Sequence, residues 1–204
     1  MVHSGTRERI LKVSKSLFAK RGYEHASTSS IAREAGTSES QLMKHFGSKA
    51  GLLEAIFSEN WIRITAEAQL AARDIASPRE RLMLLSALVV GTMERDPELK
   101  LLMLLEGRRI RREGQMVILT EGFMSFVHLL DSILEEMRDA GQLRPGLGPQ
   151  AIRSALMGML EGMLRDRFLA ERLGYPAAFD VQQVEAMLGI TLASCLLPVS
   201  AEAA

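Results

Sequence analysis

The chain has 204 residues, 25 basic and 25 acidic side chains and one cysteine, which is long enough for one helical domain and a small second one. The lone Cys195 excludes an internal disulfide, and the longest nearly apolar run, residues 82–90, is too short to cross a bilayer. Because the N-terminus also lacks an apolar signal core, we expect a reduced, cytoplasmic protein with no membrane partner. Residues 1–60 hold nine Lys and Arg against six Asp and Glu, and the other 144 residues hold sixteen against nineteen, so a slightly basic head precedes a slightly acidic body.

Apolar residues recur at intervals of three and four along the whole chain, without strand-like alternation, which predicts an all-α fold of about nine helices. Pro78 and Pro97 are each expected at the first position of a helix, where the missing N–H of proline costs least. In chain order, the predicted helices are about 6–20, 28–36, 38–45, one capped by Ser48, one from Pro78, one from Pro97, one between Gly114 and Gly141, 149–173 and 181–197.

The most informative stretch is 28–47, where two short helices are separated by little more than a turn. Gly36 supplies the left-handed backbone of that turn at no steric cost, and the small Ala32 and Ala35 allow the helices to approach closely. A major groove admits one α-helix, and a preceding helix is needed to hold it there. This stretch therefore predicts a helix-turn-helix that binds double-stranded DNA.

The second helix of this motif supplies most of the candidate base contacts. Ser38 and Gln41 have the spacing of a capping box, yet Gln41 could instead offer its amide to an adenine edge, and both uses stay open. Lys44 and His45 are expected to contact phosphates rather than bases, the alternative being a solvated polar face.

Hydroxyl groups and a lysine at two other helix starts suit phosphate oxygens. Thr28 and Ser29 begin one helix, and Ser48 and Lys49 begin the long fourth helix; capping alone would also explain Thr28 and Ser48. The complete set of candidate DNA-binding residues is Thr28, Ser29, Ser38, Glu39, Ser40, Gln41, Met43, Lys44, His45, Ser48 and Lys49.

The stretch from Arg7 to Phe57 resembles the DNA-binding head of the tetracycline-repressor (TetR) family of bacterial regulators. The matching residues, all at the family's spacing, are Ile10, Phe18, Gly22, Tyr23, Thr28, Ile31, Ala32, Ala35, Gly36, Ser38, His45, Phe46, Ser48, Lys49, Leu52 and Leu53. The family usually has a tyrosine where this chain has Met43, which cannot donate a hydrogen bond. We expect that backbone contact to be lost or replaced, with lower affinity or with compensation by Lys44.

The resemblance implies two domains: a DNA-binding head at 1–57 and a helical effector-binding and dimerisation domain at 58–204. In relatives the last two helices pack against those of a second subunit, which implies a homodimer. Gly158 and Gly162 each destabilise a helix interior by roughly 1 kcal/mol. Close packing against another helix would offset that cost. Packing of the same two helices within one chain is the alternative. The candidate dimer residues are Gly158, Gly162, Met159, Met163, Val184, Leu188, Thr191, Leu192 and Cys195.

The middle of the body is rich in Leu and Met, which suits a pocket for an apolar or amphipathic small-molecule effector, although ordinary core packing explains it equally well. His128 and Asp131 could orient a ligand, but His128 also fits a satisfied interior histidine. Arg109 belongs to a basic group near the end of the sixth helix, where the helix dipole accounts for positive charge. The candidate pocket residues are Met103, Arg109, Phe123, Phe126, His128 and Asp131.

Motifs for catalysis and metal binding are missing from the sequence: the four histidines lack metal-ligand spacing, and no nucleotide-binding loop or nucleophile elbow occurs. We expect no metal, no cofactor and no enzymatic activity. The resulting hypothesis is a dimeric transcriptional regulator, nucleoid-associated when bound, that a small ligand releases from a palindromic operator as a repressor. The alternative is an adaptor with a helix-turn-helix head that acts through a protein partner.

Overall fold

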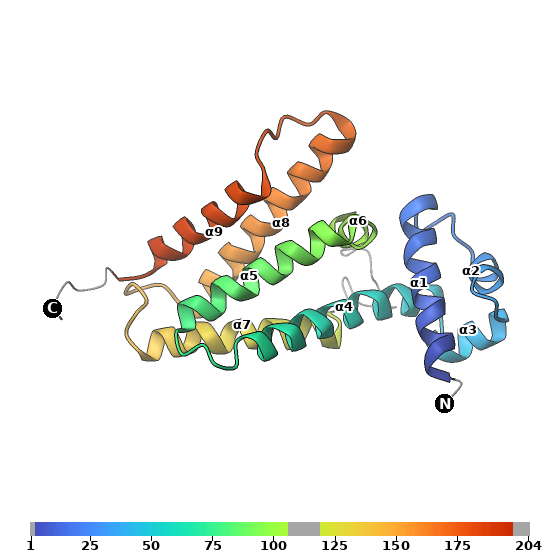
Figure 1. The fold of residues 1–204 in the computed structure, drawn as a ribbon, viewed down its shortest axis with the longest axis horizontal. Helices are drawn as coiled ribbons and strands as arrows, with labels where there is room; N and C mark the ends of the chain where they lie inside the picture. The colour runs from blue at the N-terminus through green and yellow to red at the C-terminus, as the bar shows by residue number, and fades with distance from the viewer. Residues whose placement is uncertain (1–2, 106–118, 198–204) are drawn as a thin grey trace. The chain divides into compact units, whose positions relative to one another are not determined.

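The computed structural model describes residues 3–105 and 119–197. Within these ranges the chain forms nine α-helices (Figure 1) and, apart from an isolated bridge between Leu143 and Leu196, no β-structure. This arrangement confirms the predicted all-α fold. The helices are α1 (His3–Arg21), α2 (Thr28–Glu34), α3 (Glu39–Phe46), α4 (Lys49–Ala71), α5 (Pro78–Arg95), α6 (Pro97–Leu105), α7 (Glu121–Asp139), α8 (Pro149–Leu173) and α9 (Val181–Cys195).

Local signals explain where most helices begin. The prolines at 78, 97 and 149 each occupy the first helical position, as expected. The helix after Gly114 begins later than the pattern indicates, at Glu121, because the Thr120 hydroxyl accepts the N–H of Phe123 at 3.2 Å and so caps α7 there. Gly114 itself lies outside the described residues.

The described residues form two compact units, and the first comprises the chain up to Ile64 together with Thr92–Ser125. Its core includes residues of α1 to α4, and the fully buried Leu99 and Leu102 of α6 belong to the same cluster. A helix from far along the chain therefore contributes to the core of the unit that contains residues 1–57.

Polar contacts reinforce the packing of α6 on α1 within this unit. Lys15 forms an ion pair with Asp96, and the Ser16 hydroxyl donates to the Glu98 carboxylate at 2.9 Å. Asp96 also accepts the N–H of Leu99 at 3.0 Å, so one carboxylate both caps α6 and binds α1.

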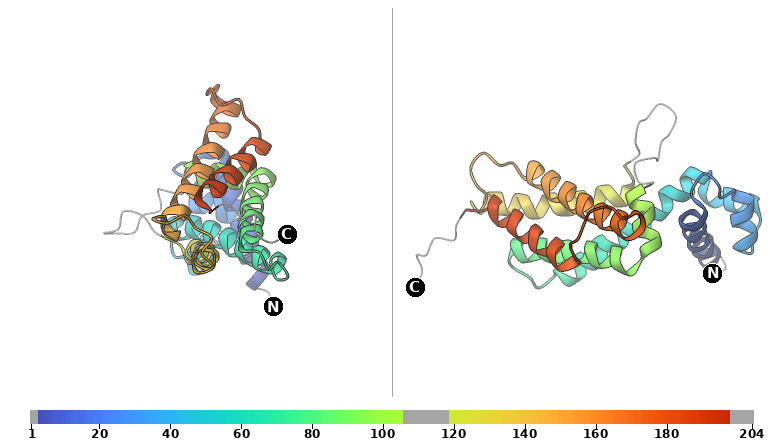
Figure 2. Two further views of the ribbon diagram at one scale, coloured as in Figure 1. Left: turned by 90° about the vertical axis from the view of Figure 1, so that its left-hand side faces the viewer. Right: turned by 90° about the horizontal axis from the view of Figure 1, so that it is seen from above.

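The second unit comprises Thr65–Gly91 and the chain from Phe126 onward. Its core includes Leu134, Met137 and Val184, all fully buried, and Figure 2 shows α8 and α9 lying side by side. The backbone of Arg144 donates to Cys195 at 2.9 Å, which ties the α7–α8 loop to the end of α9.

None of the helices in the described ranges is both long and apolar enough to span a membrane.

Candidate nucleic-acid interface

The start of α3 is set by Ser38, whose hydroxyl accepts the backbone N–H of Gln41 at 3.1 Å. The preceding turn passes through Gly36, whose φ of +64° is a conformation that favours glycine. Leu42, fully buried on the opposite side of α3, packs into the head core with Ile31 and Ala32 of α2. Burial of this one face determines which side of α3 is left for a partner.

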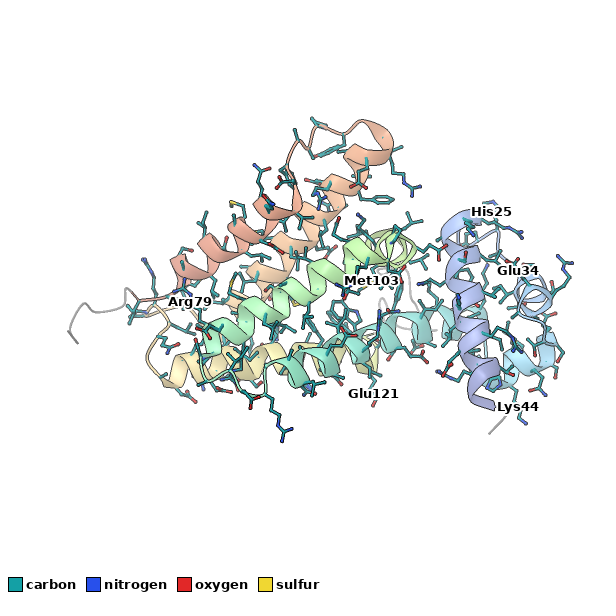
Figure 3. All side chains as sticks on the ribbon, in the orientation of Figure 1. His25, Glu34, Lys44, Arg79, Met103 and Glu121 are labelled. Atoms are coloured by element: carbon teal, nitrogen blue, oxygen red, sulfur yellow. The ribbon has the colours of Figure 1, made fainter. Side chains whose placement is uncertain are left out.

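Most of the other residues of α3 form a largely polar, exposed face, as the sequence predicts, whereas Phe46 packs against the head core. His45 is half-buried, and Figure 3 shows Lys44 projecting from the helix. Met43 is 39% exposed and offers an apolar group at the position where the family that the head resembles usually has a tyrosine. The exposed members of this face are Glu39, Ser40, Gln41, Met43 and Lys44.

The expected capping box at α3 is only half formed. In the described part of the chain, Ser38 accepts the Gln41 N–H, but no bond from the Gln41 side chain back to Ser38 is present, in contrast to the complete box that Asp180 and Gln183 form at α9. The Gln41 amide is therefore left on the exposed face, where a base edge could reach it.

Thr28 does not cap α2, contrary to one of the two expectations for it. Ser27 is the cap, accepting the Ser30 N–H at 3.1 Å, so Thr28 is the first helical residue. The Thr28 hydroxyl instead donates to the Glu39 carboxylate and joins the start of α2 to the start of α3. The Ser29 hydroxyl lies 3.1 Å from that of Ser27.

The start of α4 contains both predicted residues. The Ser48 hydroxyl accepts the Gly51 N–H at 2.9 Å and thus caps the helix. Lys49 donates to the Glu24 carbonyl at 3.2 Å, and its ammonium lies 4.4 Å from the centre of the Tyr23 ring. This cation–π contact holds the charge of Lys49 beside the α1–α2 connection.

Two arginines of α1 that the sequence did not single out hold the head together. Arg7 lies over the Phe46 ring, 5.4 Å from its centre, and forms an ion pair with Glu59. Arg9 donates to the carbonyl of Ala35 at 2.7 Å, at the end of α2. No periodic signal in the sequence marks the partners of these arginines, because all three contacts join residues that are far apart in the chain.

The candidate pocket residues are divided between the two units. In the first unit, Met103 packs against the head core, and Phe123 meets Trp61 edge-on with ring centres 5.4 Å apart. In the second unit, Phe126 is buried and Asp131 forms an ion pair with Arg153.

The other two pocket candidates are His128 and Arg109. His128 is exposed, so the expectation of an interior histidine is wrong, and Arg109 lies outside the described residues. The second unit contains a hollow of about 260 Å³ between α4, α5 and α7, and none of the five pocket candidates that the structure describes lines it. Among the described residues, no group of three or more His, Cys, Asp or Glu is placed to hold a metal ion.

The dimer candidates on α9 lie largely on its inward side. Val184, Leu188 and Leu192 are buried in the second unit, so the alternative of packing within one chain holds for these three. Thr191 also bonds inward, to the sulfur of Met159 at 3.2 Å. An apolar helix can carry two apolar sides, and periodicity alone does not identify the one that a protomer buries.

The other sides of α8 and α9 remain open in the protomer. A Cβ added at Gly158 or Gly162 would meet no atom within 4 Å. Met187 is 42% exposed and Ile190 62% exposed on α9, and the sequence did not indicate either. Met163 and Cys195 are half-buried.

Comparison with known proteins matches residues 10–56 to a family described as bacterial regulatory proteins, tetR family. The fatty acid metabolism regulator protein of Bacillus subtilis is 24% identical over 152 residues, which cover 74% of this chain and 78% of that protein. The nucleoid occlusion factor SlmA of Pectobacterium carotovorum is 28% identical over 174 residues, covering 83% and 85%.

Among solved structures, the transcriptional regulator FadR from Bacillus subtilis in complex with stearoyl-CoA has a TM-score of 0.79 at 20% identity, covering 93% of this chain and 99% of that one. At this identity the structural likeness establishes the fold.

Proposed function

From the premise that this chain is a DNA-binding regulator of the tetR family, we propose that it is a dimeric repressor that leaves its operator when a small molecule binds the body. The observation that carries the proposal is the two-sided character of α3: Leu42 is buried in the head core, and the polar residues opposite it face solvent. A helix anchored on one side and polar on the other is suited to the major groove.

The proposed contacts fall into two classes. Gln41 is the base reader, because its amide is exposed and can pair with both edge groups of an adenine. Lys44, Lys49 and Ser29 contact phosphates, which orient the helix without reading sequence. In this proposal Met43 does not make the phosphate contact of the family's tyrosine, so either the affinity for DNA is lower or the exposed Lys44 compensates.

The proposed dimer uses the open sides of α8 and α9. Ile190 and Met187 present apolar surface, and Gly158 and Gly162 leave room for a second helix to approach. Two heads are required because a palindromic operator has half-sites about 34 Å apart, and a dimer gives them a defined separation.

The proposed effector is an apolar or amphipathic molecule. The fold is similar to that of FadR solved in complex with stearoyl-CoA, which makes long-chain acyl-CoA the first compounds to try. An effector can release DNA only if it binds one conformer of the protein better than the other, and couplings of about 1–3 kcal/mol are typical.

A second candidate is a DNA-bound adaptor that acts through a protein partner. Similarity to a nucleoid occlusion factor favours it, since that name describes a role other than control of transcription.

The experiment that tests the proposal is sequencing of genomic fragments retained by the purified protein, with and without acyl-CoA and cell metabolites. A Gln41→Ala, Lys44→Ala double variant is the control, because both side chains are exposed and their loss should leave the fold intact. The expected result is enrichment of a palindromic sequence and its release by one compound. Enrichment with no release by any compound, together with a captured protein, would favour the adaptor. Equal retention of all sequences by both proteins at low salt would contradict DNA recognition altogether.

A further inference from the structure

Glu39 is the first residue of α3 and the only acidic residue in that helix. Its side chain is exposed, and one of its carboxylate oxygens, Oε1, accepts the hydroxyl of Thr28 at the start of α2. The helix dipole also favours negative charge in a first turn. Since the N-terminal residues of a recognition helix are those that contact base edges, two interactions hold this carboxylate where it can meet a base.

Thr28 is oriented toward Glu39 by the local structure of α2. Ser27 is the cap, so Thr28 is the first helical residue, and its β-branched side chain is half-buried and has few rotamers. A hydroxyl has one proton to donate, and that of Thr28 is donated to Glu39, 11 residues further along the chain. While this bond is present, Thr28 cannot donate to a phosphate.

The carboxylate of Glu39 retains capacity for a further donor. An ionised carboxylate accepts about four hydrogen bonds, and the bond from Thr28 uses one of these positions. Among the described residues, no Lys or Arg forms an ion pair with Glu39. An unpaired negative charge is repelled by DNA phosphates, so Glu39 favours binding only where the groove offers it a donor.

The four bases differ in what they offer a carboxylate in the major groove. Guanine presents two acceptors, and thymine presents an acceptor and a methyl group, so both repel it or leave it without a partner. Adenine presents an amino group beside the acceptor N7. Cytosine presents its 4-amino group alone, which makes it the base that a carboxylate pairs with at the lowest cost.

We propose that Glu39 reads a cytosine of the operator and that Thr28 is its positioning residue. The carboxylate accepts from the 4-amino group of the cytosine, and the Thr28 hydroxyl keeps the carboxylate in the orientation that allows this. The inference rests on the proposed function and deepens it by assigning a base to a second residue of α3. Glu39 and Gln41 lie about 200° apart around the helix, so they reach different base pairs.

The test uses the full-length protein and a library of DNA duplexes randomised at every position, from which bound duplexes are selected and sequenced. Glu39→Gln keeps the shape of the side chain and an oxygen for Thr28, but removes the charge. Thr28→Val removes the hydroxyl, and Thr28→Ser restores it. Glu34→Gln is the matched control, since Glu34 is an exposed glutamate at the end of α2 (Figure 3).

A second measurement isolates the amino group. The selected duplex is prepared with N4-methylcytosine in place of the selected cytosine, which replaces the N–H that faces the groove with a methyl group. Titrations then compare its affinity with that of the unmodified duplex. Because Glu39 is exposed and Gln has the same shape, this comparison gives a result even if Thr28→Val is unstable.

The wild-type protein is expected to select a cytosine at one position of each half-site. Glu39→Gln should lower that preference by about tenfold, and N4-methylcytosine should weaken wild-type binding by a similar factor. Thr28→Val should lower the preference by about threefold, Thr28→Ser should restore it, and Glu34→Gln should leave it unchanged. In the Glu39→Gln protein, Thr28→Val should have no further effect at that position, because Thr28 acts through the carboxylate.

An equal effect of Glu39→Gln on all sequences would overturn the inference, because the carboxylate would then act on the phosphates or on the fold. A loss shared by all sequences in Thr28→Val, with a smaller salt slope, would make Thr28 a phosphate contact and overturn its positioning role. A selected operator without such a cytosine contradicts this inference alone. A wild-type protein that selects no sequence contradicts the proposed function as well.

Discussion

Ser38 and Gln41 show how two neighbouring polar residues separate their roles. The hydroxyl of Ser38 accepts the N–H of Gln41, so the cap requires only the backbone of Gln41. The exposed Gln41 amide is then available to discriminate between bases, which a residue engaged in a complete capping box could not do at the same time.

Replacing Gln41 with alanine is expected to change the preference at one base pair of the operator by about 1–3 kcal/mol, because a bidentate amide–adenine pair is lost. Competition binding against operators mutated one position at a time measures this. The control is Gln142→Ala, an exposed glutamine in the α7–α8 loop. A loss shared equally by every sequence would mean that Gln41 does not read bases.

Lys49 is already engaged in the free protein, with the Glu24 carbonyl and the Tyr23 ring. If its ammonium also contacts a phosphate, Lys49→Ala should weaken binding evenly across sequences and reduce the slope of log affinity against log salt by about one. Titrations at several salt concentrations measure the slope, with Arg79→Ala as a control for the loss of one charge. A slope equal to that of the control would assign Lys49 a structural role in the head only.

At the level of elements, the contact between α4 and α7 in the first unit depends on a glycine. A Cβ at Gly122 would lie 2.0 Å from the carbonyl oxygen of Ser58, and the Gly122 N–H donates to the Ser58 hydroxyl at 3.1 Å. Since the clashing atom belongs to the backbone of a helix, no side-chain rotation can relieve the overlap.

Gly122→Ala is therefore expected to lower the free energy of unfolding by about 1–3 kcal/mol or more, the usual cost of overpacking. Gly5→Ala is the control: Gly5 is exposed in α1 with no atom within 4 Å of an added Cβ, and a gain of up to about 1 kcal/mol is expected there. Chemical denaturation followed by circular dichroism measures both. Equal free energies of unfolding for the two variants would show that α4 and α7 move apart to accommodate the added methyl group without a loss of stability.

The helix starts illustrate what local sequence can predict about elements. The prolines predicted the starts of α5, α6 and α8. The preference of proline for the first helical position depends only on the residue and its own backbone. The membership of α6 in the head core could not be predicted in this way. Lys15 and Asp96, which help to join α6 to α1, are 81 residues apart, and nothing in either segment specifies the other.

At the level of the whole molecule, the proposed dimer depends on the outward sides of α8 and α9. Ile190→Glu should place a charge in an apolar interface without a partner and raise the dimer dissociation constant by about tenfold or more. Operator affinity should fall in parallel, because a single head contacts one half-site.

Sedimentation velocity over a range of concentrations measures this effect. Leu70→Glu is the control, since Leu70 is 74% exposed and belongs to α4, a helix that is not part of the proposed interface. An unchanged dimer dissociation constant in the Ile190 variant would show that the dimer interface lies elsewhere.

The sequence by itself determined the all-α class, most helix starts, the helix-turn-helix and the polar side of α3. These features depend on caps, prolines, glycines and periodicity, which act between residues no more than about four positions apart. Only the tertiary structure decided that α6 completes the head core, that Thr28 bonds to Glu39, and that α9 buries Val184 and leaves Ile190 outside. The physical reason is that each of these outcomes depends on which distant surface excludes water from a side chain, and the same local pattern is compatible with several such surfaces.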